Sequence, residues 1–252
     1  MPASDTSGAA RRRSPVALAL LGLLALLGII GLVALGTWQV ERRAWKLDLI
    51  ARVDARIHAP PAPLPPRADW PRVTAAADEY RRVQATGTFL YDQETLTQAA
   101  TALGAGFWVM TPLRMRDGTL LVNRGFVPAG RRDRASRAAA ERPGEVTVTG
   151  LLRVTEPKGG FLRSNDPAAD RWHSRDVEAI AVARELTDVA PFFVDADATP
   201  NPGGLPVGGL TVVSFPNSHL VYALTWYALA LMLAGAAAYV AREEWRARRH
   251  PG

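Results

Sequence analysis

The chain has 252 residues, a formal net charge of +6 and no cysteine. Its length suggests one or two domains, and the absence of cysteine excludes disulfides, a C-x-x-C redox pair, a covalent C-x-x-C-H haem site and a thiolate copper site. Lys46 and Lys158 are its lysines, and the arginines are spread over both tails and the middle of the chain. Such a spread indicates no nucleic-acid partner.

Two uncharged, apolar stretches are long enough to cross a membrane. They run from Val16 to Trp38 and from Leu220 to Val240, and a helix rising ~1.5 Å per residue needs about 20 residues for the ~30 Å hydrocarbon layer. The alternative for the first stretch is a signal peptide, but its apolar run exceeds the ~7 to 15 residues of such a segment and no A-x-A-like cleavage site follows. We expect two membrane-spanning helices within the lipid bilayer, the first an uncleaved anchor.

Basic residues indicate the orientation in the membrane. Short cytoplasmic flanks are rich in arginine and lysine. Both chain ends have this composition, in residues 11–13 and 242–249, although Arg42, Arg43 and Lys46 beyond the first stretch argue the other way. Because long domains are translocated largely regardless of their charge, we expect both tails in the cytoplasm and the central domain outside it.

The first helix is expected to continue beyond the membrane and to end at a proline-rich segment. The prolines of "APPAPLPP", residues 59–66, are incompatible with a helix and favour an extended link. We assign Trp45, within the extension, a structural or partner-binding role. The side chains before the prolines recur at helical steps of three and four residues: Trp38, Arg42, Trp45, Leu49 and Val53.

The middle of the chain is typical of an antiparallel β-rich domain. Apolar and polar residues alternate in "YRRVQATGTFL" and "GEVTVTGLLRV", which is the period of a half-buried strand. "GFWVMTPLRM" and "TLLVNRGFVP" flank an Asp-Gly turn and predict a hairpin, and "PFFVDAD" and "LTVVSF" predict two more strands. Only Arg175 to Leu186 has a helical pattern, with Ser174 as its cap.

The expected fold class is therefore membrane α+β: two transmembrane helices flanking an antiparallel, barrel-like extracytoplasmic domain with one short helix. The expected division is a disordered cytoplasmic tail (1–15), transmembrane helix (16–38), helical extension (39–58), Pro-rich linker (59–79), β-rich domain (80–216), second transmembrane helix (217–240) and basic cytoplasmic tail (241–252).

His219 stands at the start of the second apolar stretch. Because both ends of the domain return to the same membrane face, Trp38 and Gln39 are expected at nearly the same depth as His219. Tyr222 and Trp226 follow at helical spacing. One hypothesis is that these side chains only anchor the helix at the membrane interface, where aromatic rings and a histidine are tolerated.

The second hypothesis is that neutral His219 is an axial ligand of haem iron. Imidazole binds haem iron well, and the neighbouring aromatic face would pack against the flat macrocycle. Arg42 or Arg43 would pair with the haem propionates at the water boundary. A single histidine suits temporary holding of the group.

Two further candidate sites lie within the domain. Asn123, Arg124 and Gly125 lie in the apolar segment "LVNRGFVP", where a guanidinium needs a carboxylate or several carbonyls. These residues form an internal tie or contact an anionic ligand or partner. A hydrolase site is not supported, since no G-x-S-x-G elbow accompanies the residues that lie close in sequence: Ser164, His173 and Asp176.

Four motifs together resemble the surfeit locus protein 1 family. They are "GTWQVERRAWK", "TPL", "LVNRGFVP" and "NSHLVYALTWYALA", which in this order cover nearly the whole chain. The resemblance implies an assembly factor for haem-copper cytochrome c oxidase and not an enzyme. It places the family's histidine on His219, its Trp-Gln motif on Trp38 and Gln39, and its Arg-Gly motif on Arg124 and Gly125.

The resemblance also implies a cofactor, partners and a location. Family members handle haem a, bound transiently and non-covalently, during its insertion into the catalytic subunit of the oxidase, so that subunit and the haem a synthesis machinery are the expected partners. The expected location is the bacterial inner membrane, with a periplasmic central domain, or the mitochondrial inner membrane in a eukaryote. The alternative is a membrane scaffold that stabilises an oxidase assembly intermediate without binding haem.

Overall fold

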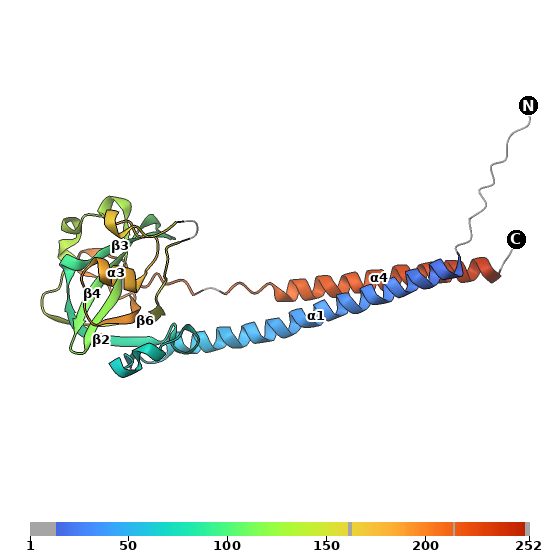
Figure 1. Ribbon diagram of the computed structural model, residues 1–252, viewed down its shortest axis with the longest axis horizontal. Helices are drawn as coiled ribbons and strands as arrows, with labels where there is room; N and C mark the ends of the chain where they lie inside the picture. The colour runs from blue at the N-terminus through green and yellow to red at the C-terminus, as the bar shows by residue number, and fades with distance from the viewer. Residues whose placement is uncertain (1–13, 161–162, 214, 250–252) are drawn as a thin grey trace, which may run out of the picture. The chain divides into compact units, whose positions relative to one another are not determined.

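The computed structural model describes residues 14–160, 163–213 and 215–249. The chain forms two compact units, a helical one of Met1–Ile50 with Phe215–Gly252 and a β-rich one of Ala51–Ser214 (Figure 1). Residues 1–13, expected to belong to a disordered tail, lie outside the described residues, and Pro15 is already helical.

The helical unit is an antiparallel pair of long helices. Helix α1 is unbroken over Pro15–His58, and α4 spans His219–Arg249 (Figure 1). Both are long and apolar enough to cross a membrane. The segment after residue 240, expected to be a tail, is thus helical through Arg249. Its alanine, arginine and glutamate residues have high helix propensity.

Small residues set the contact between α1 and α4. A Cβ added to Gly36 would lie 2.7 Å from the Tyr227 ring, and one added to Gly28 would lie 2.9 Å from Leu233. Ala223 and Ala230 of α4 are buried. A Cβ added to Gly22, nearer the start of α1, would meet nothing within 4 Å. Close approach at small residues is how membrane helices pack in the absence of a hydrophobic driving force.

The second unit is a closed, barrel-like sheet of seven strands. Their order is β1-β2-β6-β7-β5-β4-β3, and an additional pairing of β2 with β4 closes the sheet. The Asp-Gly turn joins β4 and β5 as predicted, with Met115 opposite Gly118. The strands are β1 (Ala62–Pro63), β2 (Arg82–Phe89), β3 (Thr95–Thr101), β4 (Gly104–Met115), β5 (Gly118–Pro128), β6 (Glu145–Val154) and β7 (Val189–Ala196).

The sheet differs from the expected one in three ways. The pairing of β5 with β7 is parallel, as is that of β1 with β2, because these strands meet through long-range contacts that local patterning does not encode. Strand β3 was not predicted, since six of its seven residues are Thr, Gln or Ala. The expected strand at 210–215 is absent from the described residues 210–213 and 215.

Both faces of the sheet are covered by apolar side chains. Inside the barrel the core contains Val83, Leu120, Phe192 and Val194, and on the other side Leu121 and its neighbours form a second cluster with α3. This is why nine consecutive residues of β5 are buried. Helix α3 spans Val177–Ala183, shorter than expected. Its cap is Asp176 and not Ser174, because the Asp176 carboxylate accepts a bond from the Ala179 amide at 3.2 Å.

The segment 59–79 is packed as part of the domain, although its prolines predicted a linker. Trp70 is 8% exposed within the barrel core, meets Phe192 edge-on at 6.1 Å and donates its indole N–H to the Pro65 carbonyl at 3.0 Å. One large aromatic side chain thus outweighs the extended preference of its neighbours.

The remaining short helices are α2 (Ala75–Asp78) and the 3-10 turns Arg67–Arg72, Tyr91–Gln93, Ala129–Arg131, Arg134–Ala140, Pro167–Ala169 and Pro202–Gly204.

Candidate functional site

His219, the first residue of α4, is hydrogen-bonded to Gln39 of α1. The Nδ1 atom of His219 lies 2.7 Å from the side-chain oxygen of Gln39. Because an amide oxygen can only accept, Nδ1 is the donor of this contact, and the neutral tautomer compatible with it carries its lone pair on Nε2. Histidines that bind a metal are commonly oriented in this way, by a partner of the other ring nitrogen.

The packing of the two helices fixes this pair. Gly36 is buried one turn before Gln39, against the ring of Tyr227. The Tyr227 hydroxyl lies 3.1 Å from that of Thr37. Close contact at Gly36 therefore brings the outer part of α1 against the start of α4, where His219 is half-buried.

The other predicted aromatic residues lie on the same stretches of helix but are more open. Trp38 is 52% exposed and Tyr222 is 53% exposed, whereas Trp226 is half-buried. Ala223, next to Tyr222, is the buried residue. The rings of Trp38 and Tyr222 are thus available on the outside of the helix pair.

The basic residues after Gln39 have few acidic partners. The Arg42 guanidinium lies 4.1 Å from the centre of the Trp45 ring, which is cation–π geometry and gives Trp45 a local structural role. Arg43 is half-buried. Within the described part of the chain, neither guanidinium has a carboxylate within ion-pair distance. Both charges therefore remain available to an anionic group.

Asn217 adds a polar atom that sequence reasoning did not single out. Its side-chain oxygen is buried without a hydrogen-bond partner among the described residues, and it stands two residues before His219. A buried acceptor without a donor is costly. The sequence shows that the residues before α4 are polar. It does not show whether the Asn217 side-chain oxygen is buried without a donor or exposed to water.

The described residues contain no group of three or more His, Asp or Glu side chains placed to hold a metal ion. A metal bound at His219 would therefore take most of its ligands from elsewhere. Haem meets this condition, because the porphyrin supplies four nitrogens and the protein only the axial ligand.

In the barrel, Asn123 and Gly125 make contacts within the domain. Asn123 donates to Asp195 at 2.7 Å and accepts from the Gly125 amide at 3.1 Å. Gly125 has φ +130°, and a Cβ there would lie 2.2 Å from the Val207 carbonyl oxygen, so only glycine fits. Arg124 between them points to a different set of partners, described below.

Asp195 is the centre of a buried charge network. Its carboxylate is 3% exposed and accepts from Arg153 at 3.0 Å and Arg175 at 2.8 Å. Burial by itself lowers the pKa of Arg175. The nearby carboxylates of Asp195 and Glu156 together raise this pKa by more, so the net shift is upward. The network is fully paired and holds β6 and β7 to the segment before α3. Sequence reasoning missed it, because its members come from distant segments.

Two of the three residues of the candidate hydrolase site have other partners. Asp176 caps α3, and Nδ1 of His173 lies 2.9 Å from the Gln98 side-chain oxygen. Among the described contacts no hydrogen bond joins Ser164, His173 and Asp176. They do not form a catalytic triad.

A family model described as the SURF1 family matches residues 26–231, a range that includes the His219–Gln39 pair and the whole barrel. The chain belongs to the SURF1 family. It is 38% identical over 213 residues to Surfeit locus protein 1 of Homo sapiens, covering 77% of this chain and 69% of the relative.

Two other relatives are similar over the same share of the chain. Surfeit locus protein 1 of Mus musculus is 38% identical over 212 residues, which are 77% of this chain and 67% of the relative. A SURF1-like protein of Monosiga brevicollis is 39% identical over 210 residues, which are 77% of each. The family resemblance seen in the sequence motifs is thus confirmed.

Proposed function

We propose that this SURF1-family chain is an assembly factor for haem-copper cytochrome c oxidase that holds haem a transiently at His219. The observation that carries the proposal is the bond between His219 Nδ1 and Gln39, which leaves Nε2 free as an iron ligand. In this proposal the haem a synthesis machinery supplies the group and the catalytic subunit of the oxidase receives it.

The residues around His219 fit the chemistry of haem. Nε2 of His219 would supply the axial ligand, and Trp38, Tyr222 and Trp226 offer aromatic surface for a flat macrocycle. Arg42 and Arg43 have no acidic partner within the described residues and would bind the propionates. Bound haem supplies an iron with a preference for imidazole; the protein orients the ring and neutralises the propionate charge.

Exposure of the aromatic rings supports temporary holding. Trp38 and Tyr222 keep about half of their surface open, so a macrocycle against them would lie at the outside of the helix pair. A group held there is accessible to a partner protein. An electron-transfer site would instead enclose the macrocycle and fill both axial positions.

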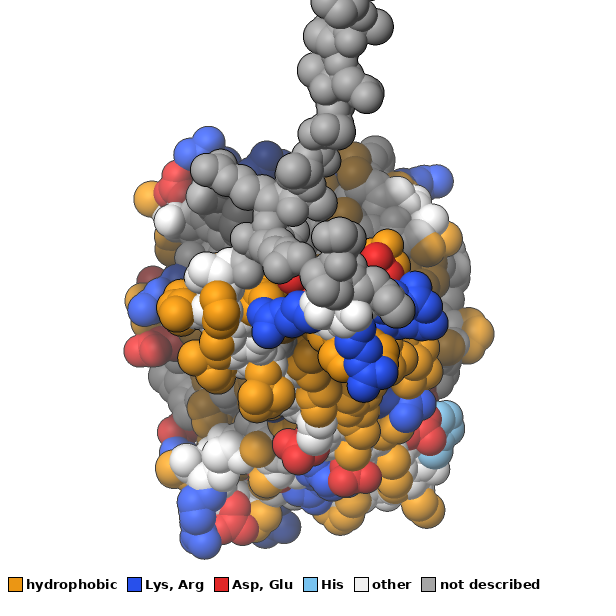
Figure 2. Space-filling model, turned by 90° about the vertical axis from the view of Figure 1, so that its right-hand side faces the viewer, with side chains coloured by type: hydrophobic (Ala, Val, Ile, Leu, Met, Phe, Trp, Pro, Cys, Tyr) orange, Lys and Arg blue, Asp and Glu red, His pale blue; other side chains and the backbone are white. Residues whose placement is uncertain are grey.

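We further propose a multi-pass protein of the bacterial inner membrane, with its central domain in the periplasm, or of the mitochondrial inner membrane in a eukaryote. The support is the charge distribution. Figure 2 views the molecule from the side of the chain termini and shows basic side chains, in blue, among hydrophobic ones, in orange. Arg246, Arg248 and Arg249 form the last turn of α4, as expected of a cytoplasmic end.

A scaffold without haem is the second candidate function. Exposed Trp38 and Tyr222 are also what a helix anchored at a membrane interface presents. In that case the chain would stabilise an oxidase assembly intermediate, and His219 would serve only the contact between α1 and α4.

Co-expression with the enzymes of haem a synthesis tests the proposal. The purified wild type is expected to show the absorption spectrum of haem a, and His219→Ala is expected to lose it. The matched control is His173→Ala, because His173 also contacts a glutamine oxygen through Nδ1, at 2.9 Å. Absence of haem from the wild type, or equal haem in His219→Ala, would exclude haem binding at His219. Loss of haem with normal oxidase assembly would favour the scaffold.

A further inference from the structure

Arg124 of β5 is a buried cation with few partners. It is 5% exposed, and its Nη2 donates to the Ala140 carbonyl at 2.7 Å. The guanidinium lies 5.2 Å from the ring centre of Phe89 and 4.9 Å from that of Tyr91. Its remaining N–H groups have no acceptor among the described residues. A guanidinium has five N–H donors, so most of its bonding capacity is unused.

Two other arginines of the barrel with largely buried side chains, Arg137 and Arg175, are paired with carboxylates. Arg137 forms two hydrogen bonds with Glu94, at 2.5 and 3.1 Å, and also donates to the carbonyls of Arg131 and Arg132. Arg175 is paired with Asp195, as described above. The fold therefore satisfies a buried guanidinium where its role is structural, and Arg124 departs from that pattern.

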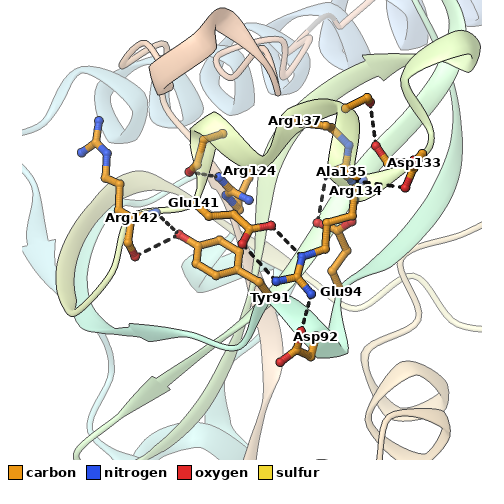
Figure 3. Close-up of polar contacts among 12 residues, drawn as sticks. Tyr91, Asp92, Glu94, Arg124, Asp133, Arg134, Ala135, Arg137, Glu141 and Arg142 are labelled. Atoms are coloured by element: carbon orange, nitrogen blue, oxygen red, sulfur yellow. Dashed lines mark hydrogen bonds and ion pairs between the residues drawn. The ribbon is translucent and has the colours of Figure 1, made fainter.

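The carboxylates nearest to Arg124 are used by other arginines. Figure 3 shows Arg124 beside Tyr91 and Glu141, with Glu141 bonded to Arg134 and Glu94 to Arg137. Burial lowers the pKa of Arg124, with the charge of Tyr91 and Glu94 acting in the opposite direction. Arg124 is thus a buried cation without a direct carboxylate contact among the described residues.

Arg124 borders a cavity of about 110 Å³. A water molecule needs only about 10–15 Å³ of such volume, so the cavity has room for a carboxylate with a short aliphatic chain. Its polar wall includes Thr149 and Asn201, and its apolar wall includes Phe89 and Val148. Asp197 also borders it, but its carboxylate is engaged by the Thr199 amide at 3.0 Å and by Arg82 at 3.9 Å.

The aromatic wall of the cavity is rigid. The Tyr91 hydroxyl accepts from the Arg142 amide at 2.8 Å and donates to the Arg142 carbonyl at 3.3 Å, and its ring meets that of Phe89 at 5.5 Å. These contacts hold the guanidinium plane in position before any ligand arrives. A preorganised fork of N–H donors in a buried setting suits the planar, bidentate geometry of a carboxylate.

We infer that this cavity is a binding site for a carboxylate, which pairs with the Arg124 guanidinium while its aliphatic part packs against Phe89 and Val148. The carboxylate belongs either to an acidic side chain of a partner polypeptide or to a small free acid. The inference does not depend on haem binding at His219, because every residue of this cavity belongs to the barrel unit.

Two probes of matched chemistry test the site. Propionate is the side-chain fragment of glutamate, and N-acetylglutamate N-methylamide carries the same fragment on a peptide backbone. Each is added to the full chain in detergent, with ionic strength held constant by sodium chloride, and the melting temperature is measured. A saturable rise is expected. Stronger binding of the blocked glutamate identifies a polypeptide source, and stronger binding of propionate identifies a free acid. No rise with either probe would overturn the inference.

Variants assign the effect to Arg124. Arg124→Met removes the charge at similar length and is expected to abolish the rise, whereas Arg114→Met, at an exposed arginine of β4, is expected to keep it. Arg124→Lys keeps the charge but loses the planar fork, and is expected to need roughly 10-fold more ligand. An unchanged ligand response in both Arg124 variants would overturn the inference.

Stability separates a ligand site from an internal tie. Because its charge is incompletely paired, Arg124→Met is expected to melt at the wild-type temperature or above in the absence of ligand. Arg137→Met breaks a buried ion pair and is expected to melt roughly 6–20 °C lower. If Arg124→Met is destabilised as strongly as Arg137→Met, or does not fold, Arg124 is a structural residue and the inference fails.

Discussion

The Nδ1 atom of His219 lies 2.7 Å from the side-chain oxygen of Gln39, although 180 residues separate the two in the chain. The whole barrel is inserted between them. A pairing of this kind persists only if α1 and α4 keep their register, so the orientation of the imidazole depends on the packing of the helices. It also makes Gln39 a positioning residue, which acts through His219.

Replacement of Gln39 tests this role. Gln39→Leu removes the acceptor and is expected to weaken haem binding by roughly 10–100-fold, as the loss of such a partner does at other metal sites. Gln39→Glu keeps an acceptor and is expected to retain haem with a lower midpoint potential, because a carboxylate makes the imidazole more basic. Absorption spectra and redox titration measure both effects. Glu41→Gln on the same helix is the control, and equal haem in Gln39→Leu would contradict the role.

Gly36 is predicted to control the register of the two helices. In Gly36→Leu the new side chain meets the Tyr227 ring, since even its Cβ would approach to 2.7 Å. We expect a lower melting temperature and loss of haem, because overpacking costs about 1–3 kcal/mol and separates His219 from Gln39. In the matched variant Gly31→Leu, the Cβ meets nothing within 4 Å, so both properties are expected to stay at wild-type level. Equal behaviour of the two variants would refute this explanation.

Local patterns predicted much of this fold, and long-range contacts account for what they missed. The alternation in β2 and the Asp117-Gly118 turn are properties of a few adjacent residues, and both elements form where expected. The parallel pairing of β5 with β7 and the burial of Trp70 depend on segments far away in the chain. No periodicity records such contacts.

The same division applies to the candidate site. Topology alone predicted that Gln39 and His219 lie at one depth, because a domain between two spans must return to its starting face. It could not predict which atoms meet, nor that Tyr222 would be open while Ala223 is buried. For Arg124 the sequence left two hypotheses open, because the choice depends on whether Glu94 and Glu141 are already paired.

Asp195 is predicted to be a main determinant of barrel stability. Asp195→Asn keeps the shape but removes the charge that pairs with Arg153 and Arg175. Two buried cations then lose an anion, and we expect a loss of about 2–4 kcal/mol, seen as a lower melting temperature of the full chain. Asp69→Asn, which breaks an exposed ion pair with Arg72, is expected to cost less than about 1 kcal/mol. Similar losses in the two variants would show that the network is not stabilising.

Glu141 is predicted to give the barrel a pH-dependent stability. The hydrogen bonds from the Arg134 guanidinium, at 2.6 and 3.0 Å, lower the pKa of the Glu141 carboxyl in the folded chain. The ionised carboxylate therefore stabilises the fold at pH values above the ordinary range for glutamate, and this contribution is lost as the pH falls through the lowered pKa. The carboxylate is 25% exposed, so we expect it to contribute about 1 kcal/mol or less at pH 7.

The variant Glu141→Gln measures this contribution. At pH 7 it is expected to melt below the wild type, and the difference is expected to shrink as the pH is lowered and to vanish once Glu141 is protonated in both states. Glu145→Gln removes an exposed carboxylate nearby and is expected to show little difference from the wild type at any pH. A gap for Glu141→Gln that stays constant or widens toward low pH would mean that the bond to Arg134 does not depend on the carboxylate charge.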